Sequence, residues 1–339
     1  MGGKMADEKK FFLTDEMAEA ATVLKSFSVA GARDAYQGAL KQNRFFLTGE
    51  GSSRIFPAKH AIDLALRKGL KQEFHTEGSY QAMELPLAGW QVFAASNSGK
   101  TKELILLLRK LQQEQQAVIG ITNGRQTPVH QLTASTYLLN CGAEQAIAAT
   151  KTVVEQALFY HALVSDLAGE DLAAQLPAVA SKAAQVLTTP VEERLTDLLA
   201  SGKRVYWVGR NDGVAEELML KTMEITRKSA MYLEGTLAFH GIEEVMSEQD
   251  VMILVDPFAW EEENFEQVLR QKIGIKIIAI SDHQTKFPTL IIPSNEDFKG
   301  YFQLMAGWKL LASAGIKLGI NIDRPARARK VGNELKEEK

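Results

Sequence analysis

The chain has 339 residues, of which 45% are hydrophobic and 24% charged, and this ordinary balance predicts a soluble globular protein long enough for two domains, each with its own core. The net charge of −3 gives no basic surplus, which argues against nucleic acid as a partner, and no apolar run approaches the ~20 residues of a membrane span. Because the single cysteine, Cys141, excludes an internal disulfide and the polar start is unlike a signal peptide, we expect a cytoplasmic protein.

The elements predicted along the chain form a repeat. A helical segment at 15–27 comes first, and short apolar strands follow at 44–48, 72–76, 90–95, 117–122 and 136–139. A second series of strands is predicted at 204–208, 230–233, 251–255, 276–280 and 289–292. Arg204 follows Arg44, and Val251 follows Trp90, by almost the same interval. The second half of the chain is therefore predicted to repeat the first.

Helical stretches separate most of these strands, for example at 102–115, 144–168 and 214–227. Short, continuously apolar strands that alternate with helices predict parallel sheets covered on both faces. We therefore predict an α/β fold of two tandem doubly wound domains joined by Ala-rich helices between 173 and 201. The expected division is a helical lead-in at 1–30, a first domain at 31–195 and a second domain with a C-terminal tail at 196–339.

Two serine-rich loops directly follow predicted strands. They are Gly49-Glu50-Gly51-Ser52-Ser53 and Ser96-Asn97-Ser98-Gly99-Lys100-Thr101. Each precedes a predicted helix, where free N–H groups and the positive end of the helix dipole favour an anion. Serine and threonine also cap helices without any ligand. Two such loops at the carboxyl ends of strands in the same half of the chain favour a phosphate site.

A possible acid–base pair comes from the second half of the chain. Glu224 lies late in the helix predicted at 214–227, and His240 lies in the glycine-bounded loop that follows the next strand. A carboxylate and an imidazole on neighbouring strand-end features could act as base and acid on one substrate. The residues alone leave open that Glu224 is an ordinary helix carboxylate and that His240 is simply one of six histidines.

Together, the loops, the repeat and the Glu/His pair resemble the sugar isomerase (SIS) family, in particular the isomerase half of glucosamine-6-phosphate synthases, from about 43 to 330. The resemblance implies two tandem flavodoxin-like SIS domains. It implies that the sugar phosphate is held by Ser52, Ser53, Ser96, Asn97, Ser98 and Thr101. It also implies that the sugar is contacted or supported by Gly51, Ala148, Ala149, Glu217 and Lys221.

The same resemblance implies the catalytic roles. Glu224, in Lys221-Thr222-Met223-Glu224, would move a proton between C1 and C2, and His240 would open the sugar ring. Lys330, in the tail that begins with Asp323-Arg324-Pro325, would form a Schiff base with a ketose. Neither a metal nor a cofactor is expected, and we find no His/Cys/Asp cluster with metal-ligand spacing. In the family the histidine loop of one subunit completes the site of the other, so we expect at least a homodimer.

The differences from the synthase pattern reduce the number of reactions that we expect. Ala149 stands in place of a serine, Ile242 in place of a proline, and Lys100 in place of an acidic residue. The synthase begins with a glutaminase domain that uses an N-terminal cysteine, whereas residue 2 here is glycine. We therefore expect isomerisation or deamination of a hexose or hexosamine 6-phosphate rather than amino-sugar synthesis.

Three other functions are compatible with parts of the sequence. A deglycase of a phosphorylated Amadori sugar, fructosamine 6-phosphate, would use the same acid and base with a different leaving amine. A non-catalytic sugar-phosphate-binding regulator would share the fold, although the presence of Glu224, His240 and Lys330 together argues against it. The segment 94–101 is one residue short of a Walker A loop, and Asp256 follows a strand as in Walker B. A nucleotide-binding protein is disfavoured because Ala94 replaces the first glycine of that loop.

Overall fold

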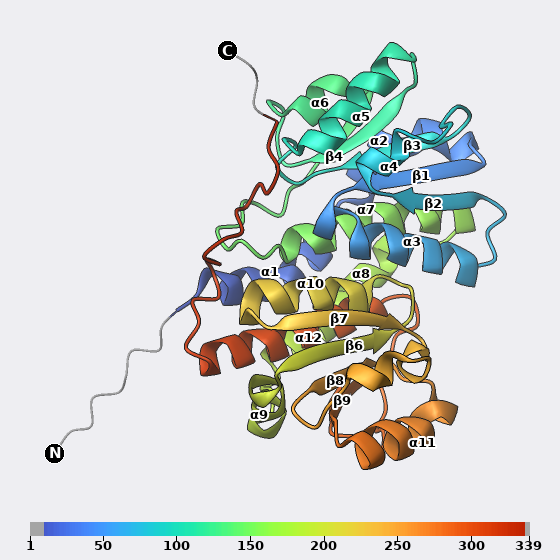
Figure 1. Ribbon diagram of the computed structural model, residues 1–339. Helices are drawn as coiled ribbons and strands as arrows, with labels where there is room; N and C mark the ends of the chain where they lie inside the picture. Colours follow the sequence, from blue (N-terminus) through green and yellow to red (C-terminus); the bar gives the residue numbers. More distant parts are fainter. Residues whose placement is uncertain (1–9, 336–339) are drawn as a thin grey trace.

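The computed structural model describes residues 10–335 and contains two five-stranded parallel sheets (Figure 1). The first sheet has the order β2-β1-β3-β4-β5, with β1 (Arg44–Gly49), β2 (Glu73–Glu77), β3 (Gln91–Ala95), β4 (Val118–Thr122) and β5 (Ser135–Leu138). The second has the order β10-β9-β8-β6-β7, with β6 (Arg204–Gly209), β7 (Ser229–Glu234), β8 (Val251–Val255), β9 (Lys276–Ser281) and β10 (Thr289–Ile291). Residues 1–9 of the expected lead-in and 336–339 of the expected second domain lie outside the described residues.

The two sheets confirm the predicted repeat and the doubly wound α/β fold. In each sheet the first strand of the series, β1 or β6, pairs in parallel with the second and the third strand. In the first sheet β2 is added on one side of β1 and the later strands on the other side, so the direction of growth reverses between β1 and β3. In the second sheet it reverses in the same way between β6 and β8. Ligands of doubly wound sheets bind at such switch points, beyond the carboxyl ends of the strands. The fold therefore offers two equivalent places for a site, one in each half.

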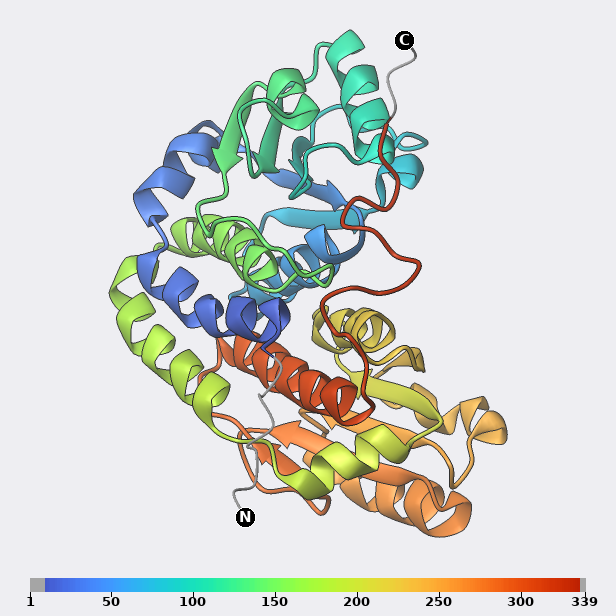
Figure 2. The same cartoon turned by 90° about the vertical axis from the view of Figure 1, so that its left-hand side faces the viewer.

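Helices form a layer between the two sheets and cover their outer faces (Figures 1 and 2). The central helices are α1 (Phe12–Ser26), α3 (Ile55–Arg67), α7 (Lys151–Ala168), α8 (Leu172–Thr188), α10 (Val214–Thr226) and α12 (Lys299–Lys317). The other helices are α2 (Val29–Tyr36), α4 (Ser79–Ala82), α5 (Lys102–Gln113), α6 (Pro128–Leu132), α9 (Glu193–Ser201), α11 (Glu262–Asn264) and the π-helical segment Phe265–Ile273. Short 3-10 turns span Gln37–Lys41, Gly51–Ser53, Leu237–Phe239, Ile242–Val245 and Ala259–Glu261. The proposed domain boundary between 195 and 196 falls inside α9.

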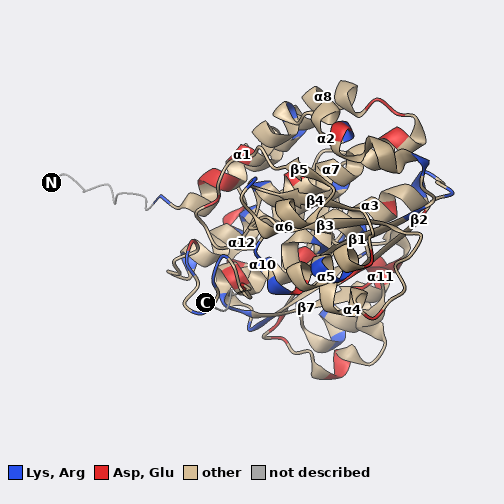
Figure 3. Ribbon diagram, turned by 90° about the horizontal axis from the view of Figure 1, so that it is seen from above, with Lys and Arg blue, Asp and Glu red and all other residues tan. Residues whose placement is uncertain are grey.

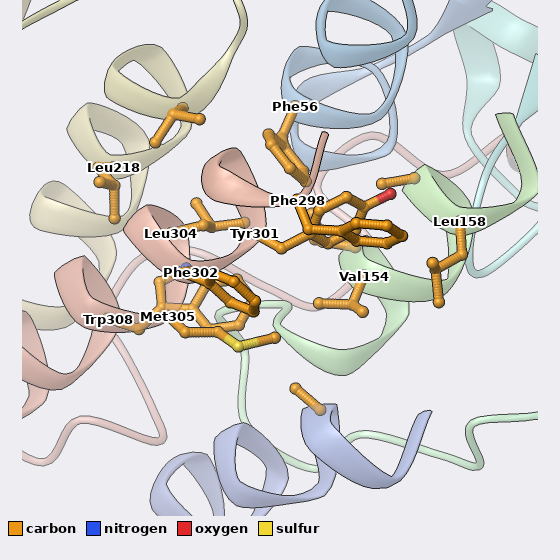
Figure 4. Packing of buried hydrophobic residues seen from close by; sticks show 14 of the residues in the cluster. Phe56, Val154, Leu158, Leu218, Phe298, Tyr301, Phe302, Leu304, Met305 and Trp308 are labelled. Atoms are coloured by element: carbon orange, nitrogen blue, oxygen red, sulfur yellow. The ribbon is translucent and has the colours of Figure 1, made fainter. Parts of the chain in front are cut away.

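The core differs from the expectation that each domain buries its own. Along β1, Phe45 and Leu47 belong to a cluster that also contains Val205 and Trp207 of β6, whereas Phe46 faces a separate outer cluster. Alternate residues of a strand point to opposite faces, so each sheet presents one face to a shared centre. Figure 4 shows this centre, where side chains of four helices meet: Phe56, Val154, Leu158, Leu218, Tyr301, Phe302 and Trp308. The two halves are therefore joined by one continuous core.

One helix begins later than the sequence predicts. A helix was expected over 144–168, but α7 begins at Lys151 and the residues before it are irregular. The Glu144 carboxylate accepts hydrogen bonds from Thr150 N at 2.7 Å and from the Thr152 hydroxyl at 2.7 Å. The N–H of Thr150 is thus paired with the Glu144 carboxylate, and that of Ala146 with the Glu16 carboxylate of α1, instead of with helix carbonyls, and the segment stays irregular.

The C-terminal tail returns from the second half of the chain to the first, as Figure 2 shows in red. Asp323 anchors its start, because its carboxylate accepts from Leu13 N at 2.8 Å and its carbonyl accepts from Ile147 N at 2.9 Å. Further on, Lys102 N donates to Asn333 O at 2.9 Å and Leu335 N donates to Lys100 O at 3.2 Å. The tail therefore pairs directly with the second serine loop.

The distribution of charged residues and the limited apolar character of the helices are as the composition predicts. Acidic and basic residues are interspersed along the described elements (Figure 3). Among residues 10–335, no helix combines the length and the apolar character that a bilayer crossing requires.

Candidate functional site

The two serine loops lie side by side at the first switch point. Gly51–Ser53 form a 3-10 turn between β1 and α3, and residues 96–101 connect β3 to α5. Because β1 pairs with β3 up to Gly49 and Ala95, the two loops leave the same edge of the sheet. Each loop leads directly into a helix N-terminus, as a phosphate site requires.

The second loop is tightly wound around its own hydroxyl groups. Ser96 is 3% exposed, and its Oγ accepts from Gly99 N at 3.1 Å and lies 2.9 Å from Thr101 Oγ1. Ser98 Oγ accepts from Lys100 N at 3.2 Å. Gly99 has a φ of +62°, and a Cβ there would lie 2.4 Å from Thr127 Cβ, so this turn admits only glycine. The Ser96 and Ser98 hydroxyls therefore stabilise the turn of the loop by hydrogen bonds within it.

Lys221 links the first loop to the second half of the chain. Its Nζ donates to Ser52 Oγ at 2.8 Å and to Glu224 Oε2 at 2.8 Å. The same Nζ lies 3.3 Å from Glu217 Oε1. Glu217, Lys221 and Glu224 are spaced four and three residues apart in α10 and therefore share one face of this helix. The Glu224 side chain is 22% exposed, whereas those of Lys221 and Glu217 are at most 1% exposed. Glu224 is therefore the member of the group that a ligand can reach.

The electrostatics of this group keep the lysine charged. Burial by itself would lower the pKa of Lys221, but the Glu224 and Glu217 carboxylates offset that effect and raise this pKa above its ordinary value. Burial raises the pKa of Glu217, and the Lys221 charge opposes the rise. A buried charge that loses its partner is strongly destabilising, so the three side chains depend on one another. They place a fixed positive charge beside both Ser52 and Glu224.

The tail brings Lys330 to the segment before α7. Lys330 Nζ donates to Ala146 O at 2.7 Å and lies 3.3 Å from Glu144 Oε2, whose side chain is fully buried. Burial would raise the pKa of Glu144, but the Lys330 charge and the hydrogen bonds from Thr152 and Thr150 bring it below its ordinary value. Ala148 is buried and Ala149 half-buried in the same segment. Lys330 thus lies next to the residues that were predicted to border the sugar.

His240 does not join this group within one chain. It is exposed, follows the turn Leu237–Phe239 and lines a groove of about 410 Å³ together with Glu243 and Asn264. Helix α10 leads into β7 and the His240 loop leaves it, so Glu224 and His240 lie towards opposite ends of this strand. A strand of six residues spans about 20 Å, which separates the two side chains too far for one sugar. Within one chain the two residues therefore lie towards opposite ends of β7, and their joint action on one substrate stays a prediction.

Several contacts of the site could not be read from sequence patterns. The Ser52–Lys221 hydrogen bond joins residues from the two halves of the repeat, and Glu16 of α1 accepts from Ala146 N at 3.3 Å. Lys100, one of the departures from the synthase pattern, forms an ion pair of 3.4 Å with Glu334 of the tail. The opposite charges of Lys100 and Glu334 were visible in the sequence, but only the fold shows that they meet.

Comparison with known proteins addresses the family and the fold. The sequence of residues 40–166 matches the SIS domain family, so this part of the chain is an SIS domain. A comparison with curated proteins found no match. The second sheet repeats the strand order of the first, and the whole structure is similar to solved structures of phosphosugar isomerases. The protein therefore has an α/β fold consistent with the two tandem SIS domains that were predicted.

Three of these solved structures illustrate the likeness. Tagatose-6-phosphate ketose/aldose isomerase from Escherichia coli has a TM-score of 0.79 and 17% identity, over 95% of this chain and 99% of that one. Glucosamine-6-phosphate deaminase from Thermotoga maritima has a TM-score of 0.71 and 17% identity, over 94% and 98%. The C-terminal domain of glucosamine-fructose-6-phosphate aminotransferase from Francisella tularensis has a TM-score of 0.74 and 16% identity, over 94% and 99%. At this identity the likeness establishes the shared fold.

Proposed function

We propose that this protein is a sugar-phosphate isomerase or amino-sugar-phosphate deaminase that acts on a hexose or hexosamine 6-phosphate. One observation carries the proposal: the buried Lys221 ammonium bonds both Ser52 of the first serine loop and Glu224, at 2.8 Å each. A phosphate-binding loop and a candidate base are thereby held in one cluster. The similarity of the fold to a ketose/aldose isomerase and to a deaminase supports the same reaction class.

In this proposal the serine loops hold the phosphate. The N–H groups at the starts of α3 and α5 and the hydroxyls of Ser53, Ser96 and Ser98 donate to its oxygens. The Lys221 charge adds electrostatic attraction beside Ser52. Gly51, Asn97 and Thr101 complete the loops, and the segment around Ala148 and Ala149 borders the sugar.

Glu224 then transfers the proton that defines the reaction. Its carboxylate removes the proton from C2 of the open-chain aldose and returns it to C1, through an enediol, to give the ketose. With a 2-amino sugar the corresponding enolamine becomes an imine at C2, which water hydrolyses to the ketose and ammonia. Lys221 stabilises the negative charge near Glu224 during the transfer. Lys330, beside the 144–150 segment, would form a Schiff base with a ketose carbonyl with release of water.

Ring opening is assigned to His240 from a second copy of the chain. Because His240 is far from Glu224 in its own chain, the cyclic sugar requires His240 of the partner subunit. We therefore propose a homodimer in which each site combines α10 of one subunit with the histidine loop of the other. A cytoplasmic location suits both phosphorylated substrates and a free thiol at Cys141.

The experiment that tests the function is a substrate panel. Hexose 6-phosphates, hexosamine 6-phosphates and fructosamine 6-phosphates are incubated with the protein, and ketose 6-phosphate, ammonia and free amino acid are assayed together. We expect ketose 6-phosphate from at least one aldose or hexosamine substrate. Amino acid released only from fructosamine 6-phosphates would replace the proposal with a deglycase. Binding of these sugars without any turnover would identify a regulator instead.

A further inference from the structure

The second switch point holds a cavity that the proposed reaction does not use. It lies beyond the carboxyl ends of β6, β8 and β9, in the position that the serine loops occupy in the first sheet. Its volume is about 280 Å³, and its walls include His60, Arg210, Asp212, Asp256, Asp282 and Lys299. Pockets for drug-sized ligands start at about 300 Å³, so this one suits a smaller molecule.

The charges around the cavity differ from those of a phosphate site. Carboxylates outnumber basic groups among the lining residues, which include Asp63, Asp212, Asp256, Asp282 and Glu296 against Arg67, Arg210 and Lys299. Burial lowers the pKa of His60 to about 4, so this imidazole is neutral and adds no positive charge. A free phosphate would meet a net negative wall, and an ammonium group would be attracted to it.

Some N–H donors of the basic side chains in the wall nevertheless make no hydrogen bond among the described residues. Asp256 Oδ2 accepts from Arg210 Nη1 and lies 2.8 Å from Lys299 Nζ. Arg210 makes its hydrogen bonds among the described residues through Nη1, so its other N–H groups remain free to bind. A ligand carboxylate can therefore be bound by Arg210 and Lys299 while Asp256 holds both in place.

Asp212, like Glu296, is a carboxylate of the wall that forms no ion pair among residues 10–335. Its Oδ1 accepts from Val214 N at 3.0 Å. Burial raises the pKa of Asp212 to about 6, although the Val214 hydrogen bond and the more distant charges of Arg210 and Arg67 oppose the rise. An ammonium group from a ligand would pair directly with this carboxylate.

The cavity wall holds a buried polar atom without a partner. His60 is 5% exposed, and its Nε2 has no hydrogen-bond partner among the described residues. Buried polar atoms are nearly always hydrogen-bonded in folded proteins. This nitrogen, in the same wall as the unpaired charge of Asp212, indicates that a polar ligand completes the cavity.

A metal ion fits this arrangement less well than an organic cation. Ligand atoms of Asp256, Asp282 and His283 lie within 4.8 Å of one another. The Asp256 carboxylate, however, already binds Arg210 and Lys299, and a divalent ion would lie beside these two fixed positive charges. The repulsion opposes metal binding at this point.

We propose that this cavity binds a small zwitterion, a free α-amino acid, with its ammonium group against Asp212 and its carboxylate against Arg210 and Lys299. In this orientation the acidic Asp212 and the basic Arg210 and Lys299 each face a ligand group of opposite charge. The site is separate from the serine loops and from Glu224, so its ligand would act as an effector rather than as a substrate.

The test compares chemically matched probes by isothermal titration. Free L-α-amino acids are titrated into the full-length protein, with the N-acetyl and amide derivatives of any that bind. We expect at least one free amino acid to bind and both derivatives to fail, because each lacks one of the two charges. No binding by any free amino acid, or equal binding by the derivatives, would overturn the proposal.

Variants then locate the binding. Asp212→Asn keeps the Oδ1 that accepts from Val214 N and removes the charge, and Lys299→Met removes the other charge. Each should weaken binding by about tenfold or more, as expected for a hydrogen bond to a charged group. Asp34→Asn, at an exposed site, is the matched control and should bind as the parent does. Binding that survives both cavity variants, or that is lost in Ser96→Ala instead, would place the amino acid elsewhere. Saturable Mn²⁺ binding that Asp282→Asn abolishes would show a metal site in its place.

Discussion

Glu224 is the residue on which the proposed chemistry depends, and its position suits that role. It is the accessible end of a buried group in which Lys221 supplies the positive charge. The alternative is that Glu224 only pairs with the buried Lys221 and so contributes to stability rather than to catalysis. The two possibilities differ in what happens when only the charge of Glu224 is removed.

Replacing Glu224 by Gln therefore tests the base directly. Gln keeps the shape and the hydrogen bond to Lys221 but cannot take up a proton. Loss of a general base typically lowers the rate by about 10²–10⁴-fold, or roughly 3–5 kcal/mol at ~1.4 kcal/mol per decade. Steady-state kinetics should show this fall in kcat, while titration shows little change in sugar-phosphate affinity. A Glu224→Gln protein that folds, binds and turns over within about threefold of the parent would remove Glu224 as the base.

His60 predicts a dependence of stability on pH. Burial lowers its pKa to about 4 in the folded protein, whereas an unfolded chain has a histidine pKa near 6.5. Below about pH 6.5 the unfolded state binds a proton that the folded state does not, so stability is lost as the pH falls from 6.5 towards 4. The loss from this residue is about 3 kcal/mol by linkage. Burial also lowers the pKa of the neighbouring His161, which acts in the same direction.

Thermal unfolding between pH 7 and pH 4 measures this effect. We expect the midpoint of the parent to fall with pH and that of His60→Gln to fall less steeply, whatever its absolute value. His75→Gln serves as the control, because the His75 side chain is 47% exposed. Parallel pH profiles for the parent and His60→Gln would contradict the assignment.

At the scale of elements, the serine loops combine a short strand, a tight turn and a helix start. The Ser96–Thr101 loop is organised by its own hydroxyls, and its neighbour is tied to α10 by Lys221. The tail also pairs with residues 100–102, so a ligand in these loops would contact elements from both halves of the chain. Binding there should stabilise the whole fold.

The prediction for these loops concerns the phosphate group. A sugar 6-phosphate should raise the thermal midpoint, because a ligand bound only by the native state stabilises it by mass action. The unphosphorylated sugar should have no such effect. The triple replacement of Ser53, Ser96 and Ser98 by Ala should abolish the shift, while Ser26→Ala, on the exposed end of α1, should leave it intact. Equal stabilisation of the parent by ATP and by the sugar phosphate would instead favour a nucleotide site.

At the scale of the whole molecule, the separation of Glu224 from His240 means that the proposed mechanism requires a dimer. Glu224→Gln chains and His240→Ala chains should each be poorly active on a cyclic sugar. Mixed dimers contain one site with both intact groups, so mixing the two proteins after mild dissociation should restore part of the activity. With an open-chain substrate His240→Ala should lose much less, because ring opening is no longer needed.

Sedimentation at the assay concentration provides the check on this prediction. A homodimer is expected for the active protein. A monomer that is fully active at the same concentration, or mixed variants that never recover activity, would refute the shared site.

The sequence by itself determined the strands, the repeat and the nature of the candidate residues. Short apolar strands such as Val251–Val255 are visible because burial on both faces requires continuous hydrophobic residues. The serine loops and the Lys221–Glu224 spacing each involve residues that are close together in the chain, so they are visible in the sequence. The later start of α7 was not visible, because the carboxylate of Glu16 that binds Ala146 N comes from a distant helix.

The tertiary structure alone decided how these parts meet. It joined two expected cores into one, placed Lys221 against Ser52 across the repeat, and separated His240 from Glu224. It also formed the charged cavity at the second switch point from four loops and two helices. These contacts depend on side chains far apart in the chain, and their geometry follows from how the sheets and helices pack rather than from any spacing along the sequence.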